Sequence, residues 1–398
     1  MVDLLKGVRV LSFNHFLMGP VGVQFLADLG ADVIAVEPPD GAFQRKWSGA
    51  NNKRVDGQSM LLLVGNRNKR SLVLDLKKPE AIEIARKLVA TADVLTENFR
   101  PGVLDKLGLG YEAARAIKPD IIYATASGYG SDGPYVNRPG QDLLVQALSG
   151  LAAITGTKNQ GPRAIGVSAV DHHGGALFAA GILAALVGRA KSGKGCRVDV
   201  NLLSAALDLQ QESLTCYMNG EPPDDTRQPE HVAGWYYSAP YGLYATRDGH
   251  IAISLGSLDV LGDALELPRE QRVPDAEAFT RRDEITRAIA ANVAERTTDE
   301  CVSLFTARAI WHAPVSDYSK LAGDPQIVHN RSFQTVPGVT GAPITLVSHP
   351  IRYDGQVPDV RLPPQKLGAQ SEEILRELGY DAAAIRSLYG TGAIGQKL

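Results

Sequence analysis

Short apolar runs separated by helical stretches are the feature that most restricts how this chain folds. The runs lie at residues 8–13, 32–37, 71–76, 93–96 and 120–125 and are rich in Val, Ile and Leu. Strands that are apolar on both faces are typical of a parallel sheet covered by helices on both sides. We therefore predict an α/β fold with a mostly parallel sheet, whose ligands bind at the carboxyl ends of the strands.

The second half of the chain changes character at Asn219. Before it, the pattern predicts an apolar helix at 174–191, a strand at 197–201 and a helix at 202–218; after it comes an acidic, Pro-rich stretch typical of a linker. Beyond the linker, strand patterns around a tight RDGH turn predict antiparallel hairpins, and residues 283–307 are helical. We predict a large domain over 1–224, a smaller α+β domain over 225–325 and a C-terminal segment over 326–398 that returns to the large domain.

Composition excludes several classes of protein. The 398 residues carry a formal charge of −3, so no positive field attracts the chain to nucleic acid or to an anionic membrane. Three cysteines are too few for a disulfide framework or a zinc site, and we expect no metal. The apolar stretch 176–187 is shorter than the roughly 20 residues that span a bilayer, so we expect a helix buried inside protein. Since no signal-peptide pattern opens the chain, we expect a cytoplasmic protein with no membrane partner.

The first strand is not followed by a dinucleotide-binding motif. The turn after it reads NHFLMGP and has a single glycine, whereas the dinucleotide fingerprint needs three at fixed spacing. The P-loop, H-E-x-x-H and G-x-S-x-G motifs do not occur either. The sequence therefore argues against a nicotinamide or flavin enzyme, and we expect no tightly bound cofactor.

Two strand ends carry residues suited to a nucleotide. The turn from His15 to Pro20 leads into a predicted helix whose free N–H groups suit an anion. On local evidence an ordinary turn with His15 hydrogen-bonded locally is the preferred interpretation. Asn98, Phe99 and Arg100 combine an amide, an aromatic face and a guanidinium. These three could bind an adenine nucleotide, and a solvated loop is the alternative.

Asp171 lies directly before the most apolar helix and allows two interpretations. Asp is a favoured N-cap, and on local evidence that interpretation is preferred. The other is a nucleophile or base at a glycine-lined approach. His172 and His173 follow, but neighbouring residues rarely chelate one metal ion without further ligands, and no other candidate ligand stands at a telling spacing.

Several segments together resemble the family III coenzyme A (CoA) transferases, the CaiB/BaiF and formyl-CoA transferase family. The resemblance covers nearly the whole chain, and its most specific motifs are ENF-PG-L--LGL-Y and GILAAL--R--SGKG. The segments are FLADLGADVIAVEPP, NKRSLVLDLKKPE, ADVLTENFRPGVLDKLGLGYE, IIYATASGYGSDGPY, DHHGGALFAAGILAALVGRAKSGKGCRVDVNLLSA and PDAEAFTRRDE.

The resemblance implies an enzyme that moves CoA from an acyl-CoA thioester to a free carboxylic acid. It implies a Rossmann-like large domain, a small domain in mid-sequence and an interlocked homodimer. The catalytic aspartate of the family falls on Asp171, which would form an aspartyl-acyl anhydride and then an aspartyl-CoA thioester. The helix N-terminus would help to keep Asp171 charged.

The resemblance also implies a CoA site, with CoA as a co-substrate and acyl-CoA and a carboxylic acid as partners. Glycines Gly128 and Gly130 would let backbone approach the thioester. Carried over by position, the CoA-binding residues are His15, Phe16, Leu17, Leu74, Lys77, Asn98, Phe99, Arg100, Lys106, Arg138, Gly140 and Gln141.

Three positions depart from the family pattern. Val170 is bulkier than the residue common before the aspartate, and Pro38 replaces a common CoA-contacting Arg. Gln141 stands where the racemase branch has a His, and an amide cannot exchange a proton at neutral pH. We therefore favour transfer over α-proton exchange, with a racemase that uses His172, or a silent CoA-binding homologue, as alternatives. The sequence does not name the acids.

Overall fold

The computed structural model describes residues 2–220 and 223–395, which form two compact units. The sheet unit consists of Met1–Val145, Ser168–Leu209 and Pro325–Leu398, and the small unit of Gln146–Val167 and Gln210–Asp324. Residues 146–167, 210–220 and 223–224, which we placed in the large domain, thus pack with the small unit. The two units are defined by contacts, whereas a domain is a part of the chain that folds independently. The predicted domain boundaries therefore stay a prediction.

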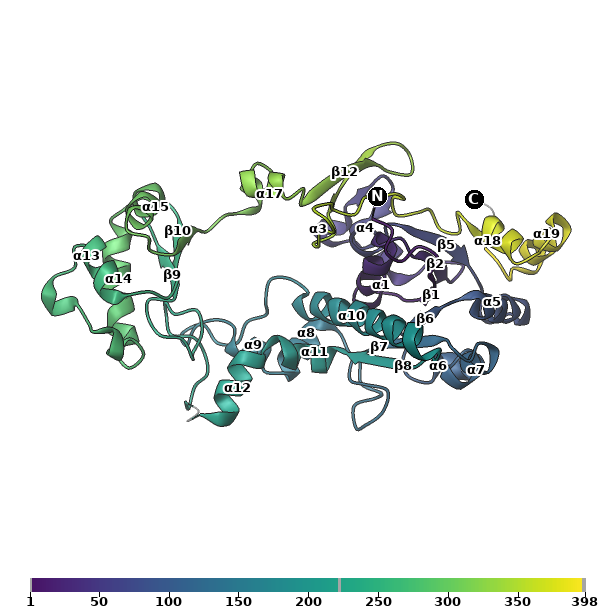
Figure 1. Ribbon diagram of the computed structural model, residues 1–398, viewed down its shortest axis with the longest axis horizontal. Coiled ribbons are helices and arrows are strands. Elements are labelled where there is room, and N and C mark those ends of the chain that lie inside the picture. Colours follow the sequence, from purple (N-terminus) through teal and green to yellow (C-terminus); the bar gives the residue numbers. More distant parts are fainter. Residues whose placement is uncertain (1, 221–222, 396–398) are drawn as a thin grey trace. The chain divides into compact units, whose positions relative to one another are not determined.

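Six parallel strands form the sheet of the sheet unit, in the order β5-β2-β1-β6-β7-β8 (Figure 1). Numbered along the chain within this sheet, the strand order is 3-2-1-4-5-6. This is the doubly wound arrangement, in which successive strands are added first on one side of the first strand and then on the other. The strands are β1 (Arg9–Phe13), β2 (Asp32–Glu37), β5 (Lys69–Val73), β6 (Val94–Glu97), β7 (Ile122–Ser127) and β8 (Arg197–Asn201). The predicted parallel α/β sheet is confirmed.

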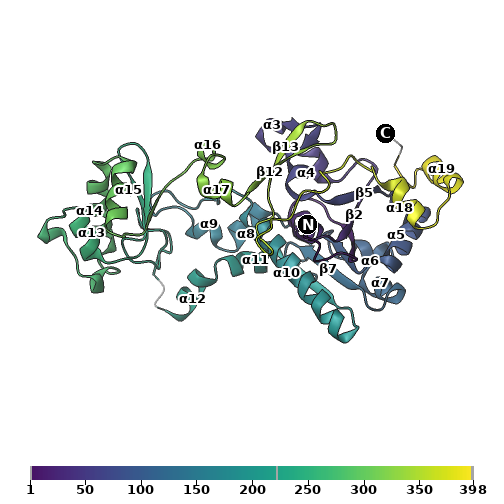
Figure 2. The same cartoon turned by 45° about the horizontal axis from the view of Figure 1, so that its top comes forward.

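Helices cover both faces of this sheet. On one face α5 (Pro79–Thr91), α7 (Tyr111–Ile117), α18 (Ser371–Glu377) and α19 (Ala382–Thr391) bury their apolar sides against alternate strand residues such as Leu11, Leu95 and Tyr123. Both views show α18 and α19 beside α5 (Figure 1 and Figure 2). The other face carries α1 (Met18–Asp28) and α10 (Ala169–Ser192), which pack against each other.

Short elements complete the sheet unit. They include the hairpin of β12 (Phe333–Pro337) and β13 (Pro343–Val347), which pair antiparallel. The others are α2 (Phe43–Lys46), α3 (Gly49–Asn52), β3 (Arg54–Val55), β4 (Gln58–Ser59), α4 (Met60–Gly65), α6 (Val103–Lys106), α8 (Asp142–Leu148), which runs into the small unit, α11 (Leu202–Leu209) and α17 (Pro325–His329).

The small unit is built on an antiparallel sheet of β9 (Gly242–Ala245), β10 (His250–Ile253) and β11 (His312–Pro314), in the order β11-β10-β9. Buried side chains such as Tyr244 and Phe305 form its core. Its helices are α9 (Leu151–Ile154), α12 (Gln211–Asn219), α13 (Leu258–Ala264), α14 (Arg282–Ala294), α15 (Thr298–Ala307) and α16 (Tyr318–Leu321), with 3-10 turns η1 (Arg269–Gln271) and η2 (Asp275–Glu277).

Two predicted helices are each two helices in the structure. The stretch 283–307 breaks because Thr297 and Glu300 form a capping box that starts α15. The stretch 202–218 breaks at Gln210, which precedes α12. In both cases apolar periodicity continues across the break, so periodicity alone did not reveal it.

The apolar helix α10 is less buried than we predicted. By length and composition it could cross a membrane, yet only a third of its most apolar part is buried in this chain. The buried side chains cluster in its first half, where Val170, Phe178 and Ile182 face the rest of the unit. The prediction of a helix buried inside protein is therefore wrong for its second half within a single chain.

Helices α1 and α10 approach so closely that glycines meet at the contact. A Cβ placed on Gly22 would lie 2.7 Å from the carbonyl oxygen of Gly175, and a Cβ on Gly174 would lie 3.0 Å from the Met18 side chain. Met18 contacts Gly174, and Gly22, one helical turn after Met18, contacts Phe178, one turn after Gly174. The contacts therefore advance in the same direction along both helices. The two helices therefore run parallel, and their N-termini lie together.

We predict opposite effects from the same substitution at two glycines. Gly22→Ala places a methyl group against fixed backbone and should destabilise the chain by about 1–3 kcal/mol. In Gly390→Ala, on α19, the new Cβ has no described atom within 4 Å, and the chain should gain about 0.5–1 kcal/mol from helix propensity. Urea unfolding midpoints measure both. Equal shifts of the same sign would contradict the close contact.

Candidate active site

The sheet reverses its strand order between β1 and β6, and the turns after these strands are joined by side-chain bonds. The backbone N–H of His15 donates to Asn98 Oδ1 at 2.8 Å, and Asn98 Nδ2 donates to the His15 carbonyl at 2.7 Å. This is the position where doubly wound sheets bind ligands. The structure thus brings together two of the strand ends singled out in the sequence.

An aromatic group surrounds His15 at this point. Its ring lies edge-on to Phe16 at 4.8 Å and to Phe99 at 5.1 Å between centroids. Burial lowers the pKa of His15 to about 4, so the imidazole is neutral at pH 7 and adds no charge for a phosphate. Phe16 has a φ of 58°, in the left-handed region that non-glycine residues rarely adopt, and such strain concentrates at functional sites.

Asp171 lies in the first turn of α10. The helix starts at Ala169 and Ser168 is its N-cap, so the interpretation of Asp171 as the cap is wrong. The Asp171 side chain accepts no hydrogen bond from any residue that the structure describes, and its backbone N–H donates to Asp142. Burial, followed by the charge of Asp142, raises its pKa to about 7.

Asp142 is a site residue that the sequence analysis missed. It lies in the first turn of α8, and its Oδ1 accepts the backbone N–H of Asp171 at 3.0 Å. This bond ties the start of α10 to the start of α8 and brings a second carboxylate close to the first. The signal was present in the sequence as an acidic residue at the start of an apolar stretch, but nothing there connects it to a residue 29 positions away.

The two histidines after Asp171 differ in their surroundings. His173 Nε2 lies 2.7 Å from Asp208 Oδ2 on α11, and burial lowers the pKa of His172. Among the residues that the structure describes, no group of three His, Cys, Asp or Glu side chains could hold a metal ion.

The remaining CoA-binding candidates lie near carboxyl ends of strands. Leu74 and Lys77 follow β5, and Leu74 is buried in the core, so its side chain is not free to contact CoA. Gly140 packs against Gly128, where a Cβ would lie 2.4 Å from the Gly128 Cα. Three other candidates lie next to helices: Leu17 precedes α1, Lys106 ends α6 and Gln141 precedes α8. Arg100 follows β6, and the Arg138 guanidinium lies over the Tyr135 ring, 3.9 Å from its centroid.

Arg45, a cation shortly after Pro38, is paired with a carboxylate and is not free to bind CoA. It lies in α2 and forms an ion pair with Glu37, its Nη2 lying 2.6 Å from Oε1. Both side chains are largely buried, so Arg45 holds the end of β2 in place rather than replacing the missing Arg at position 38.

Comparison with known sequences decides the family. Residues 5–371 match the sequence profile described as CoA-transferase family III. The chain belongs to the family III CoA-transferases. It is therefore an enzyme of this family, and CoA fits as its co-substrate.

Similar proteins cover nearly the whole transferase chain. Succinyl-CoA:glutarate CoA-transferase of Mus musculus is 34% identical over 404 residues, which cover 98% of this chain and 90% of the relative. Succinate–glutarate CoA-transferase of Agrobacterium fabrum is 30% identical, with 94% of this chain and 95% of the relative covered. The crystal structure of a CAIB/BAIF family protein from Brucella suis is 29% identical, with a TM-score of 0.82, and covers 95% of this chain and 100% of that one.

Removing the charge of Asp142 should lower the pKa of Asp171 in this transferase. In Asp142→Asn the neighbouring negative charge is lost, so the ionised form of Asp171 becomes easier to reach. Carbon-13 NMR of labelled aspartates, with Asp171→Asn used to assign the signal, measures the titration. A midpoint that stays at about 7 in Asp142→Asn would show that burial alone raises it.

Proposed function

We propose that this transferase moves CoA between an acyl-CoA and a free carboxylic acid through covalent intermediates on Asp171. The observation that carries the proposal is a largely buried carboxylate with no hydrogen bond to any described residue. Burying a carboxyl group without a partner is unfavourable, and a fold gains nothing structural from it. Such a group is suited to a reaction that needs a weakly solvated oxygen nucleophile that is not held by hydrogen bonds.

In the proposed cycle, four steps transfer CoA and regenerate the free Asp171 carboxylate. The Asp171 carboxylate attacks the thioester carbonyl, the carbon–sulfur bond breaks, and CoA leaves as a thiolate beside an aspartyl-acyl anhydride. The thiolate attacks the aspartyl carbonyl and releases the first acid, leaving an aspartyl-CoA thioester. The acceptor carboxylate attacks this thioester, the carbon–sulfur bond breaks, and CoA leaves again as a thiolate beside a second anhydride. The thiolate attacks the acyl carbonyl of the acceptor, which forms the new acyl-CoA and frees the Asp171 carboxylate. No step consumes water, so the energy of the thioester is kept.

The strand-end turns of the sheet unit supply groups suited to CoA. Phe99 offers an aromatic face to adenine, and Asn98 fixes the turn through His15. Because His15 is neutral, we assign the phosphate charge to the basic candidates Lys77, Arg100, Lys106 and Arg138. The names of the relatives make glutarate and succinate the first acids to test.

We also propose that the active enzyme is an interlocked homodimer. The second half of α10 exposes apolar side chains such as Val187, although the first half packs against α1. A soluble enzyme is expected to cover so long an apolar surface, and a second copy of the chain would do so.

Replacing Asp171 should abolish transfer. Asp171→Asn keeps the size of the side chain but removes the nucleophile, so the rate of CoA exchange between succinyl-CoA and glutarate should fall at least about a thousandfold. Mass spectrometry of the wild-type protein with succinyl-CoA should detect an aspartyl-CoA adduct on Asp171 that hydroxylamine removes. Full activity in Asp171→Asn would refute the mechanism.

A second experiment with the wild-type protein distinguishes transfer from α-proton exchange. Gln141 cannot act as an acid or base, so the enzyme should not exchange the α-protons of a 2-methylacyl-CoA with deuterated water. Exchange without an acceptor acid, lost in His172→Asn, would instead support the racemase alternative.

The rate of transfer should rise with pH through about 7. Only ionised Asp171 attacks the thioester, and its pKa is raised to about 7 by burial and Asp142, so activity is low at pH 6 and levels off above pH 8. Initial rates at subsaturating acyl-CoA give the profile of the free enzyme. In Asp142→Asn the same curve should move to lower pH, and an unchanged profile in both proteins would contradict control by Asp171.

A further inference from the structure

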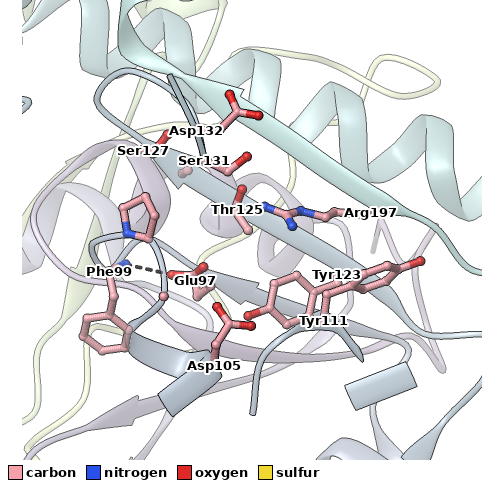
Figure 3. Close-up of a pocket in the computed structure, with 13 residues that line it drawn as sticks. Glu97, Phe99, Asp105, Tyr111, Tyr123, Thr125, Ser127, Ser131, Asp132 and Arg197 are labelled. Atoms are coloured by element: carbon pink, nitrogen blue, oxygen red, sulfur yellow. Dashed lines mark hydrogen bonds between the residues drawn. The ribbon is translucent and has the colours of Figure 1, made fainter. Parts of the chain in front are cut away.

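A cavity of about 290 Å³ opens in the sheet unit beside the carboxyl ends of β6 and β7. Figure 3 shows its polar side chains converging from several elements. Glu97 ends β6, Asp105 lies on α6, Tyr123 and Thr125 lie on β7, and Arg197 begins β8. Asp171 is not among the lining residues, so this cavity is separate from the nucleophile.

Carboxylates outnumber free cations in this cavity. Glu97, Asp105 and Asp132 line it, and the one basic residue of the lining, Arg197, is paired with Asp199. Its Nε and Nη2 lie 3.0 and 2.8 Å from Asp199 Oδ1, so its charge is balanced there. The remaining charge of the lining is negative and favours a cation.

Two buried groups in the lining have hydrogen-bonding capacity left over. Tyr123 is only 3% exposed, and its hydroxyl makes no hydrogen bond to any described residue. Glu97 is 8% exposed; its Oε2 accepts the backbone N–H of Phe99 at 2.9 Å, while Oε1 has no partner in the described chain. Buried polar groups are normally satisfied, so unused capacity that faces a cavity points to a ligand.

We propose that this cavity binds a small organic cation that carries a primary ammonium group. An ammonium donates three hydrogen bonds, and Glu97 Oε1, the Asp105 carboxylate and the Tyr123 hydroxyl offer three oxygen acceptors. The aromatic rings of Tyr111 and Tyr123 suit the carbon chain of an alkylamine. A metal ion is a poorer fit, because no group of three potential ligands was found among the described residues.

Binding of a cation should release a proton from Glu97. The pKa of Glu97 is raised to about 7, chiefly by burial and also by the charges of Asp105 and Asp199, while the Phe99 N–H and Arg197 oppose the rise. Tyr111 of α7 and Tyr123 of β7 also face the cavity, and burial raises the pKa of Tyr123 further above neutral pH. A bound ammonium favours the ionised carboxylate, so about half a proton should leave per ligand at pH 7.

Calorimetric titration of the full-length protein tests the proposal. Butylamine and putrescine are the probes, and butan-1-ol is the uncharged match for butylamine. We expect saturable binding of the amines but not of the alcohol, with proton release seen as a dependence of the heat on buffer ionisation enthalpy. Glu97→Gln should weaken binding at least tenfold and remove the proton release, and Tyr123→Phe should weaken it about threefold or more.

Two controls separate this site from the proposed mechanism and from general charge. Glu83→Gln, an exposed carboxylate of α5, and Asp171→Asn should both bind the amines as the wild type does. Circular dichroism confirms that each variant is folded, and Tyr123→Phe carries the test if Glu97→Gln is not. Absence of saturable amine binding up to about 10 mM, or binding that neither variant changes, overturns the proposal.

Discussion

The contact between Gly22 of α1 and Gly175 of α10 sets the geometry on which the active site depends. Side chains normally hold helix axes 8–10 Å apart, and two facing glycines allow a closer approach. Because the helices run parallel, the first turn of α10 lies level with the turn that precedes α1. Asp171, one turn before Gly174 and Gly175, is thereby held at the end of α10 that lies toward the start of α1, without any bond from its own carboxylate.

This packing also explains the chemistry of the carboxylate. The first turn of α10 is buried on the side of α1, so water is partly excluded from Asp171, and the nearby Asp142 opposes its ionisation. Both effects make the negative charge less stable than it is in water. An oxyanion in that condition gains more from forming a covalent bond than a well-solvated one does, and it forfeits no hydrogen bonds to protein when it reacts. Asp142 also accepts the backbone N–H of Asp171, so one residue both positions the proposed nucleophile and contributes to its raised pKa.

The parts that the sequence predicted correctly depend on short-range patterns. Successive residues are apolar in β1 and β2, as at Val10 and Leu11 and at Val33 and Ile34. A strand buried on both faces requires apolar side chains at successive positions, so the pattern predicts such strands. The start of α10 was misplaced because an aspartate in the first turn and an aspartate at the N-cap look alike in sequence. The Asp142–Asp171 contact and the cavity could not be predicted, because they depend on which residues neighbouring elements bring together, as when Leu95 pairs with Tyr123 across β6 and β7.

The turn that follows β6 has two functional sides. Asn98 bonds to the backbone of His15 at the point where the strand order reverses, while Glu97, on the face of Leu95, looks into the cavity. The two residues are adjacent, and alternation along a strand is what turns successive side chains to opposite faces. The Glu97 carboxylate accepts the N–H of Phe99, the ring that lies beside His15. Ionised Glu97 accepts that bond more strongly than the neutral acid does, so the charge state of the cavity acts directly on the backbone of the proposed CoA site.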